Sequence, residues 1–323
     1  MSGVTFADVE AARRRIAGRV LRTPLRPSAS LSERAGLPVL LKHEQRQITG
    51  SFKLRGAVNA VLSLTAEQRG RGVVTVSTGN HGRGLAHAAA LDGVPCTVCM
   101  SSLVPQNKRD GIAALGAAIR IFGRSQDEAE IGAKALAREQ KLVMVHPFDQ
   151  SEIIAGQGTL GLEIIEAAPE LECLLVPLSG GGLAAGVALA AKTVKPELRV
   201  IGVSMARGAA MAESLRAGRP IEVEELPTLA DALGGGIGLE NRLTFAMARD
   251  LLDDVVLVEE AEIAAAIAHA WRSEGEIVEG AGAVGLAAIL AGKIHPAGPT
   301  IVVLSGGNID PQLHRRIIAG PLS

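Results

Sequence analysis

The sequence predicts an α/β protein built on two doubly wound, mostly parallel sheets. Short continuous apolar runs, such as 73–77 and 173–178, alternate with longer amphipathic runs, which is typical of buried parallel strands joined by helices. At least eight such apolar runs are present, so we expect two sheets rather than one. Glycine-rich turns follow three of these runs, at the carboxyl ends where ligands bind in this fold class.

The expected elements follow one another along the chain, each strand an apolar run and each helix an amphipathic run. A helix over 5–17 comes first, followed by an irregular link over 22–27. Strands are expected at 38–42, 73–77, 96–100, 118–122, 142–145, 173–178, 199–203, 254–258 and 300–304. The remaining helices are expected at 52–64, 81–91, 105–116, 126–139, 151–167, 183–192, 209–216, 241–252, 260–274 and 282–290, with a short last helix.

Composition excludes several classes of function. The 323 residues are 47% hydrophobic and carry a formal net charge of -1, which indicates a large core and no preference for nucleic acid or an anionic membrane. No apolar run approaches the roughly 20 residues of a membrane span, and no signal peptide is evident, so we expect a cytoplasmic protein. Three cysteines cannot form a disulfide framework, and Cys96 and Cys99 should point to opposite faces of one strand.

Lys53 is the first candidate catalytic residue. Gly50 interrupts the preceding segment and Ser51 is expected to cap the helix over 52–64, so that Lys53 lies in its first turn. There the helix dipole and neighbouring Arg55 should both lower the pKa of the ammonium group. A partly neutral lysine is an amine nucleophile suited to a Schiff base with a carbonyl compound, although an ordinary surface lysine fits the local pattern too.

Two glycine-rich turns suit an anion and a heterocycle. The strand 73–77 runs into Thr78-Gly79-Asn80-His81-Gly82, where the backbone amides suit an anion and the Asn80 amide could donate to a phenolate-like oxygen. The last strand runs into Ser305-Gly306-Gly307-Asn308, whose serine hydroxyl could bond a heterocycle nitrogen. Each pattern is also compatible with an ordinary turn.

A third turn suits a phosphate. Successive amides in Ser179-Gly180-Gly181-Gly182-Leu183, at the start of a helix, would form a nest for this anion. The alternative is a dinucleotide fingerprint over 180–186. An NAD site would need an acidic residue after the next strand, where this chain has Ser204 with Arg207 nearby, so only an NADP variant remains open.

Taken together, these motifs resemble the fold-type II pyridoxal-phosphate enzymes of the serine/threonine dehydratase and serine racemase group. The resemblance extends over 22–308, and the run Gly50-Ser51-Phe52-Lys53-Leu54-Arg55-Gly56-Ala57 is its most specific part. It implies that pyridoxal 5'-phosphate is bound covalently by Lys53. The other cofactor-binding residues that it implies are Phe52, Asn80, Gly180, Gly181, Gly182, Leu183, Glu279 and Ser305. The substrate-binding residues that it implies are Ser77, Thr78, Gly79, Asn80 and His81.

The same resemblance implies a lyase. Lys53 would remove the α-proton of a β-hydroxy amino acid such as L-threonine or L-serine, and elimination of the hydroxyl would lead to a 2-oxo acid and ammonia. Thr78 stands where racemases place an acid/base group. The alternatives are a serine racemase, a hydroxyaspartate ammonia-lyase, or a hydroxyectoine-utilisation dehydratase, to which the segment 43–49 is similar. From other classes, an NADP-dependent oxidoreductase and a non-catalytic phosphate-ligand binding protein stay open.

The resemblance also implies a domain organisation. We expect a large cofactor-binding domain formed by 1–74 and 148–323, a small domain formed by 75–147 and no C-terminal regulatory domain, which favours a catabolic role. Racemase-like members bind a divalent metal through an acidic pair where this chain has Ser204 and Ala210, so we predict no metal. The expected partner is an amino-acid substrate, with neither nucleic acid nor membrane, and the protein should be a homodimer or homotetramer.

Overall fold

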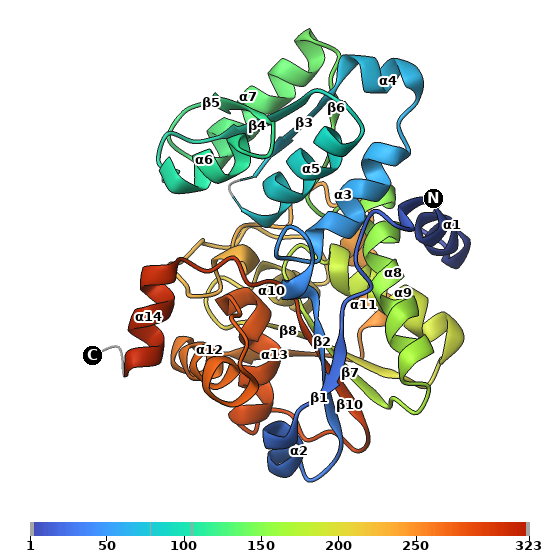
Figure 1. Cartoon of the computed structure of the whole chain (residues 1–323), viewed down its shortest axis with the longest axis vertical. Helices are drawn as coiled ribbons and strands as arrows, with labels where there is room; N and C mark the ends of the chain where they lie inside the picture. The colour runs from blue at the N-terminus through green and yellow to red at the C-terminus, as the bar shows by residue number, and fades with distance from the viewer. Residues whose placement is uncertain (1–2, 78, 105, 321–323) are drawn as a thin grey trace.

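Two sheets form the framework of the molecule. The computed structural model describes residues 3–77, 79–104 and 106–320 (Figure 1). The larger sheet has the strand order β1-β2-β10-β7-β8-β9, and the smaller sheet has the order β5-β4-β3-β6. Every neighbouring pair is parallel except β1 with β2. The predicted α/β class with two mostly parallel sheets is therefore confirmed.

The strands are short and largely apolar. Those of the larger sheet are β1 Leu25–Pro27, β2 Val39–His43, β7 Cys173–Pro177, β8 Arg199–Met205, β9 Asp254–Val258 and β10 Thr300–Leu304. Those of the smaller sheet are β3 Val73–Val76, β4 Cys96–Met100, β5 Ala118–Ile121 and β6 Val143–Met144. The domain division at 74/75 and 147/148 stays a prediction.

Helices flank both sheets. They are α1 Phe6–Ile16, α2 Ala29–Ala35, α3 Lys53–Leu62, α4 Ala66–Arg71, α5 Asn80–Leu91, α6 Gln106–Ala113, α7 Gln126–Glu139, α8 Ser151–Ala167, α9 Gly182–Val194, α10 Ala210–Ala217, α11 Thr244–Leu251, α12 Glu260–Glu274, α13 Gly280–Leu290 and α14 Pro311–Ala319. Two single 3-10 turns, η1 Glu44–Arg46 and η2 Asp231–Leu233, complete the set of described helices. No helix of the described residues is both long enough and apolar enough to cross a membrane.

The core of the larger sheet lies on both of its faces. Alternate side chains of β7 point to opposite faces, as the pleat requires. Leu174 and Val176 pack in the cluster formed with α8 and α9, whereas Leu175 packs in the cluster formed with α12 and α13. Figure 1 shows these two helix layers on either side of the sheet. Burial on both faces explains why the central strands read as continuous apolar runs.

Several local predictions need correction. The segments β1, α2 and α4 were not expected from the sequence; β1 has three residues and ends in Pro27, which a sheet tolerates only because β1 is an edge strand. Cys96 and Cys99 do point to opposite faces, because they belong to different core clusters, and both are free and buried.

Helix α3 lies between the two sheets and carries Lys53 as its first residue (Figure 1). It packs closely on α8 because both helices have glycine at the crossing: a Cβ on Gly156 would lie 2.6 Å from the Cα of Gly56. It also approaches α5, where a Cβ on Gly84 would lie 3.3 Å from the carbonyl carbon of Lys53. Lys53 thus lies where α3 meets α8 and α5, the helices that pack against it from the larger and the smaller sheet.

Candidate active site

Lys53 occupies the expected first turn, but its surroundings differ from the prediction. Its side chain is partly buried, and Nζ donates to the carbonyl oxygen of Pro147 at 2.7 Å. Burial lowers the pKa of Lys53 to about 8. Burial, and not Arg55, is the cause, because two carboxylates neutralise the charge of that arginine. A substantial fraction of neutral amine is therefore present near pH 8.

Ser51 does not cap helix α3, so this prediction was wrong. The N-cap residue is Phe52, and Ser51 forms an isolated bridge with Gly306 in the turn after β10. The amide of Phe52 donates to the carbonyl oxygen of Ser305 at 3.0 Å. These backbone contacts tie the start of α3 to the end of β10, and they leave the Ser51 hydroxyl buried without a hydrogen-bond partner among the described residues.

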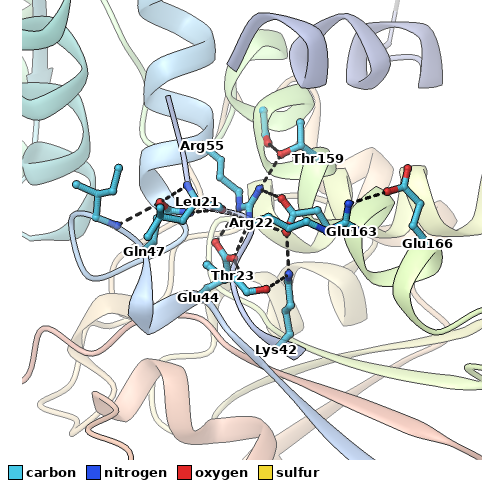
Figure 2. Close-up of polar contacts among 12 residues, drawn as sticks. Leu21, Arg22, Thr23, Lys42, Glu44, Gln47, Arg55, Thr159, Glu163 and Glu166 are labelled. Carbon is cyan, nitrogen blue, oxygen red and sulfur yellow. Dashed lines mark hydrogen bonds and ion pairs between the residues drawn. The ribbon is translucent and has the colours of Figure 1, made fainter. Parts of the chain in front are cut away.

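A buried charge network holds the first turn of α3 (Figure 2). Arg55 donates to both carboxylate oxygens of Glu44 at 2.8 Å and to those of Glu163 at 2.7 and 3.0 Å. Lys42 donates to Glu163 and to the carbonyl oxygen of Thr23, each at 2.7 Å. Two cations face two carboxylates, so the network is electrically balanced and joins β2, η1, α3 and α8.

The triple-glycine turn after β7 has the features of an anion site. Gly181 adopts a φ of +88°, which favours glycine, and it is the N-cap of α9 with no capping side chain. The first amides of α9, including that of buried Leu183, are therefore not bound by a cap, and they suit a phosphate. The ring of Phe148 lies against the turn, because a Cβ on Gly180 would come within 2.4 Å of it.

The start of α5 brings other predicted residues together. Gly79 is its N-cap and Asn80 its first residue. The hydroxyl of Ser77 accepts from the amide of Gly82 at 3.0 Å and so takes one helix-start donor. His81 is buried, and burial together with Lys53 lowers its pKa to about 3, so this imidazole is neutral. Thr78, the predicted acid/base residue, lies outside the described residues.

Asn80 links the two sheets through a chain of amides and one carboxylate. Its Nδ2 donates to Glu279 at 2.6 Å, and its Oδ1 accepts from Nδ2 of Asn308 at 2.6 Å. Asn308 also donates to the carbonyl oxygen of Thr49 at 3.0 Å. Burial raises the pKa of Glu279 to about 7, with nearby Asp231 adding to the rise. Glu279 can therefore hold or release a proton near neutral pH.

The structure brings nearly all predicted site residues to one place. Ser305 is buried at the end of β10, beside the start of α3. A Cβ on Gly306 would lie 2.1 Å from Oε1 of Glu279, so this turn also touches the Asn80 chain. Two participants were missed. Asn308 stood in a quoted motif without a role, and Pro147 contributes only a backbone carbonyl, for which a sequence carries no signal.

Ser204, which stands where racemase-like members were expected to have a metal ligand, has no ligand set around it among the described residues. Ser204 donates to the sulfur of Met205 at 3.7 Å. No group of three or more His, Cys, Asp or Glu side chains that could hold a metal is present among the described residues. The absence of a metal from the enzyme itself stays a prediction.

The residues present fit pyridoxal phosphate. A partly buried amine of lowered pKa offers the covalent attachment point. The uncapped start of α9 offers unbound amides for a phosphate, and the glycine turn before it leaves room for the backbone to approach closely. Asn80 and Ser305 add amide and hydroxyl groups from two further elements.

Comparison with known proteins identifies the family. The family model for "Pyridoxal-phosphate dependent enzyme" matches residues 16–306, nearly the whole chain. The chain belongs to this family. It is a pyridoxal-phosphate enzyme of the fold-type II class, which favours a phosphate nest over an NADP fingerprint in the segment 180–186.

Three relatives illustrate the likeness. A protein of Sinorhizobium fredii, provisionally named a threonine dehydratase, is 56% identical over 321 residues, which is 99% of this chain and 97% of that protein. The L-threonine ammonia-lyase of Thermotoga maritima is 43% identical over 98% of this chain and 78% of its own length. The solved structure of maize serine racemase superposes with a TM-score of 0.93 at 34% identity, covering 98% of both chains.

Proposed function

We propose that this enzyme eliminates water from a β-hydroxy amino acid such as L-threonine or L-serine and releases a 2-oxo acid and ammonia. The observation that carries the proposal is the Lys53 amine of lowered pKa, hydrogen-bonded to Pro147, whose neighbour Phe148 lies against the triple-glycine turn, at a helix start tied to Ser305. The names of the dehydratase and ammonia-lyase relatives support the choice of reaction. The serine racemase likeness makes racemisation the competing outcome.

The residues have separate binding roles in this proposal. Lys53 would hold the cofactor aldehyde, the amides from Gly180 to Leu183 its phosphate, Asn80 its 3-oxygen and Ser305 its ring nitrogen. Phe52 and Glu279 would border the ring. The amides and hydroxyls from Ser77 to His81 would hold the substrate carboxylate.

Lys53 is the proposed general base. Bound pyridoxal phosphate withdraws electrons from the α-carbon of an attached amino acid. Once its amine is released, Lys53 can take the α-proton, and a pKa near 8 suits that transfer at neutral to slightly alkaline pH. Ser305 presents a neutral hydroxyl instead of a carboxylate, so it does not stabilise a proton on the ring nitrogen. Loss of a β-leaving group is favoured over a long-lived carbanion for that reason.

A substrate panel tests the function. Wild-type enzyme should release ammonia and 2-oxo acid from at least one of L-threonine, L-serine and hydroxyaspartate, and a chelator should leave the rate unchanged. Lys53→Ala should reduce turnover by about 10³-fold or more, whereas Lys134→Ala, at an exposed lysine paired with Glu130, should retain it. Inversion of the serine α-carbon without ammonia release would show that the enzyme is a racemase and not a lyase. An unimpaired Lys53→Ala would overturn the residue assignment.

The remaining proposals concern the whole protein. We propose a cytoplasmic homodimer or homotetramer with the small domain at 75–147. Light scattering on the purified holoenzyme tests the assembly, and a monomeric mass at micromolar concentration would contradict it.

A further inference from the structure

The segment from His146 to Asp149 connects the smaller sheet with helix α8, and two of its residues, Pro147 and Phe148, contact the site. The Pro147 carbonyl accepts from Lys53, and the Phe148 ring lies against Gly180. His146 braces the segment, since its Nδ1 accepts from the amide of Asp149 at 2.8 Å. The segment therefore contacts both the lysine and the glycine turn.

Asp149 supplies a helix cap from a distant part of the chain. Its Oδ1 accepts from the amides of Leu243 and Thr244, each at 2.9 Å, and its Oδ2 accepts from the amide of Arg242 at 2.7 Å. Arg242 and Leu243 are the last two residues before α11 and Thr244 is its first; Leu243, the N-cap residue, provides no side-chain cap, and Asn241 accepts only from the next amide, that of Phe245. One carboxylate thus satisfies three helix-start amides, an arrangement that the helix dipole strengthens.

The start of α11 forms the wall behind the middle glycine of the turn. A Cβ on Gly181 would lie 3.0 Å from the Cβ of Thr244 and 2.8 Å from the terminal methyl of Met211. Thr244 is fully buried. Phe148 lies against the turn at Gly180, and a Cβ on Gly182 would come within 3.0 Å of the Phe148 Cα. The turn is therefore enclosed by α11 and by the segment that carries Asp149.

We propose that Asp149 is a positioning residue for the cofactor phosphate. By binding α11 to the connecting segment, its carboxylate keeps both walls against the triple-glycine turn and so holds the turn amides in the phosphate-binding arrangement. Asp149 would act through these walls and not by binding the phosphate itself. This inference rests on the cofactor placement proposed above, and it adds a residue that lies outside the lysine and glycine motifs.

Pyridoxal phosphate and pyridoxal provide the decisive comparison, because pyridoxal has the aldehyde and ring but no phosphate. In cofactor-free Asp149→Asn, the amide nitrogen cannot accept hydrogen bonds, so at least one helix-start donor loses its acceptor. We expect affinity for pyridoxal phosphate to fall roughly 10- to 100-fold, the scale of a lost charge-assisted hydrogen bond. Affinity for pyridoxal should stay within about twofold of wild type, since only the phosphate contacts change.

Asp253→Asn is the matched control. Asp253 also accepts a hydrogen bond from a distant backbone amide, that of Val200 at 2.7 Å, but at the amino-terminal end of β8, away from the glycine turn. The affinity of Asp253→Asn for both compounds should match that of the wild-type protein. Should Asp149→Asn fail to fold, Asp149→Ser keeps one acceptor oxygen and serves in its place. Binding is followed by the visible absorbance of the attached cofactor, with a thermal melt of each cofactor-free protein.

The outcomes separate the two proposals. If Asp149→Asn loses affinity for pyridoxal phosphate and not for pyridoxal, the positioning role is supported. Equal losses of affinity for both compounds in Asp149→Asn, or an affinity for both that matches wild type, would overturn it. Wild-type protein that binds neither compound would instead overturn the cofactor placement itself.

Discussion

At the scale of single residues, burial sets the chemistry of the site. The pKa values of Lys53 and Glu279 shift in opposite directions, because burial disfavours the charged form of each side chain. The lysine pKa falls to about 8 and the glutamate pKa rises to about 7, so both groups titrate close to neutral pH. Burial by the surrounding side chains is the main cause of both shifts. The site is therefore prepared for proton transfer by its own packing.

Glu279 should make stability depend on pH. Its folded pKa of about 7 exceeds the reference value of 4.5, so its contribution is fully present below pH 4.5 and is lost as pH rises through 7. A shift of this size corresponds to about 3 kcal/mol. We expect cofactor-free Glu279→Gln to lack this loss when the free energy of unfolding is measured by urea titration from pH 4.5 to 8.

The exposed Glu240 provides the control for this measurement. Glu240→Gln should follow the wild-type profile throughout the pH range. If Glu279→Gln also follows it, the carboxyl group of Glu279 does not carry a raised pKa.

At the scale of elements, α3 is positioned by contacts along its whole first half. Backbone bonds tie its start to β10, Arg55 ties its first turn to η1 and α8, and Gly56 lets α8 approach. Arg55 and Glu44 are both fully buried. Such a network stabilises only while its charges are balanced, and loss of one partner leaves the others uncompensated.

Arg55→Met tests this network. The substitution keeps a long apolar side chain but leaves Glu44 buried without its cation, so we expect a loss of about 3 to 5 kcal/mol in the free energy of unfolding. Arg216→Ala is the comparison, because Arg216 pairs with Glu213 on the surface and should contribute below about 1 kcal/mol. Equal stabilities of the two variants in urea titrations would show that the buried network contributes little.

At the scale of the whole molecule, the alternation of apolar and amphipathic runs was enough to predict two parallel sheets. This alternation did not predict α4 and β1, because a six-residue polar helix and a three-residue edge strand have too little periodicity to be recognised. The motifs after β3, β7 and β10 were predictable, since the carboxyl ends of strands share one edge.

Contacts between distant segments could not be predicted. The Ser51 cap was wrong because the backbone of that segment pairs with the turn after β10, a tertiary contact with no local signal. The helix cap from Asp149 and the hydrogen bond from Lys53 to Pro147 join residues about 90 positions apart. Local propensity contains no information on either contact.

The covalent attachment of pyridoxal phosphate to Lys53 is the central claim, and peptide mapping tests it most directly. The protein is incubated with pyridoxal phosphate, reduced with borohydride, digested and analysed by mass spectrometry. We predict that the reduced cofactor is found on the peptide that contains Lys53 and is absent from Lys53→Ala. Reduced cofactor on a different lysine, with Lys53 unmodified, would contradict the account.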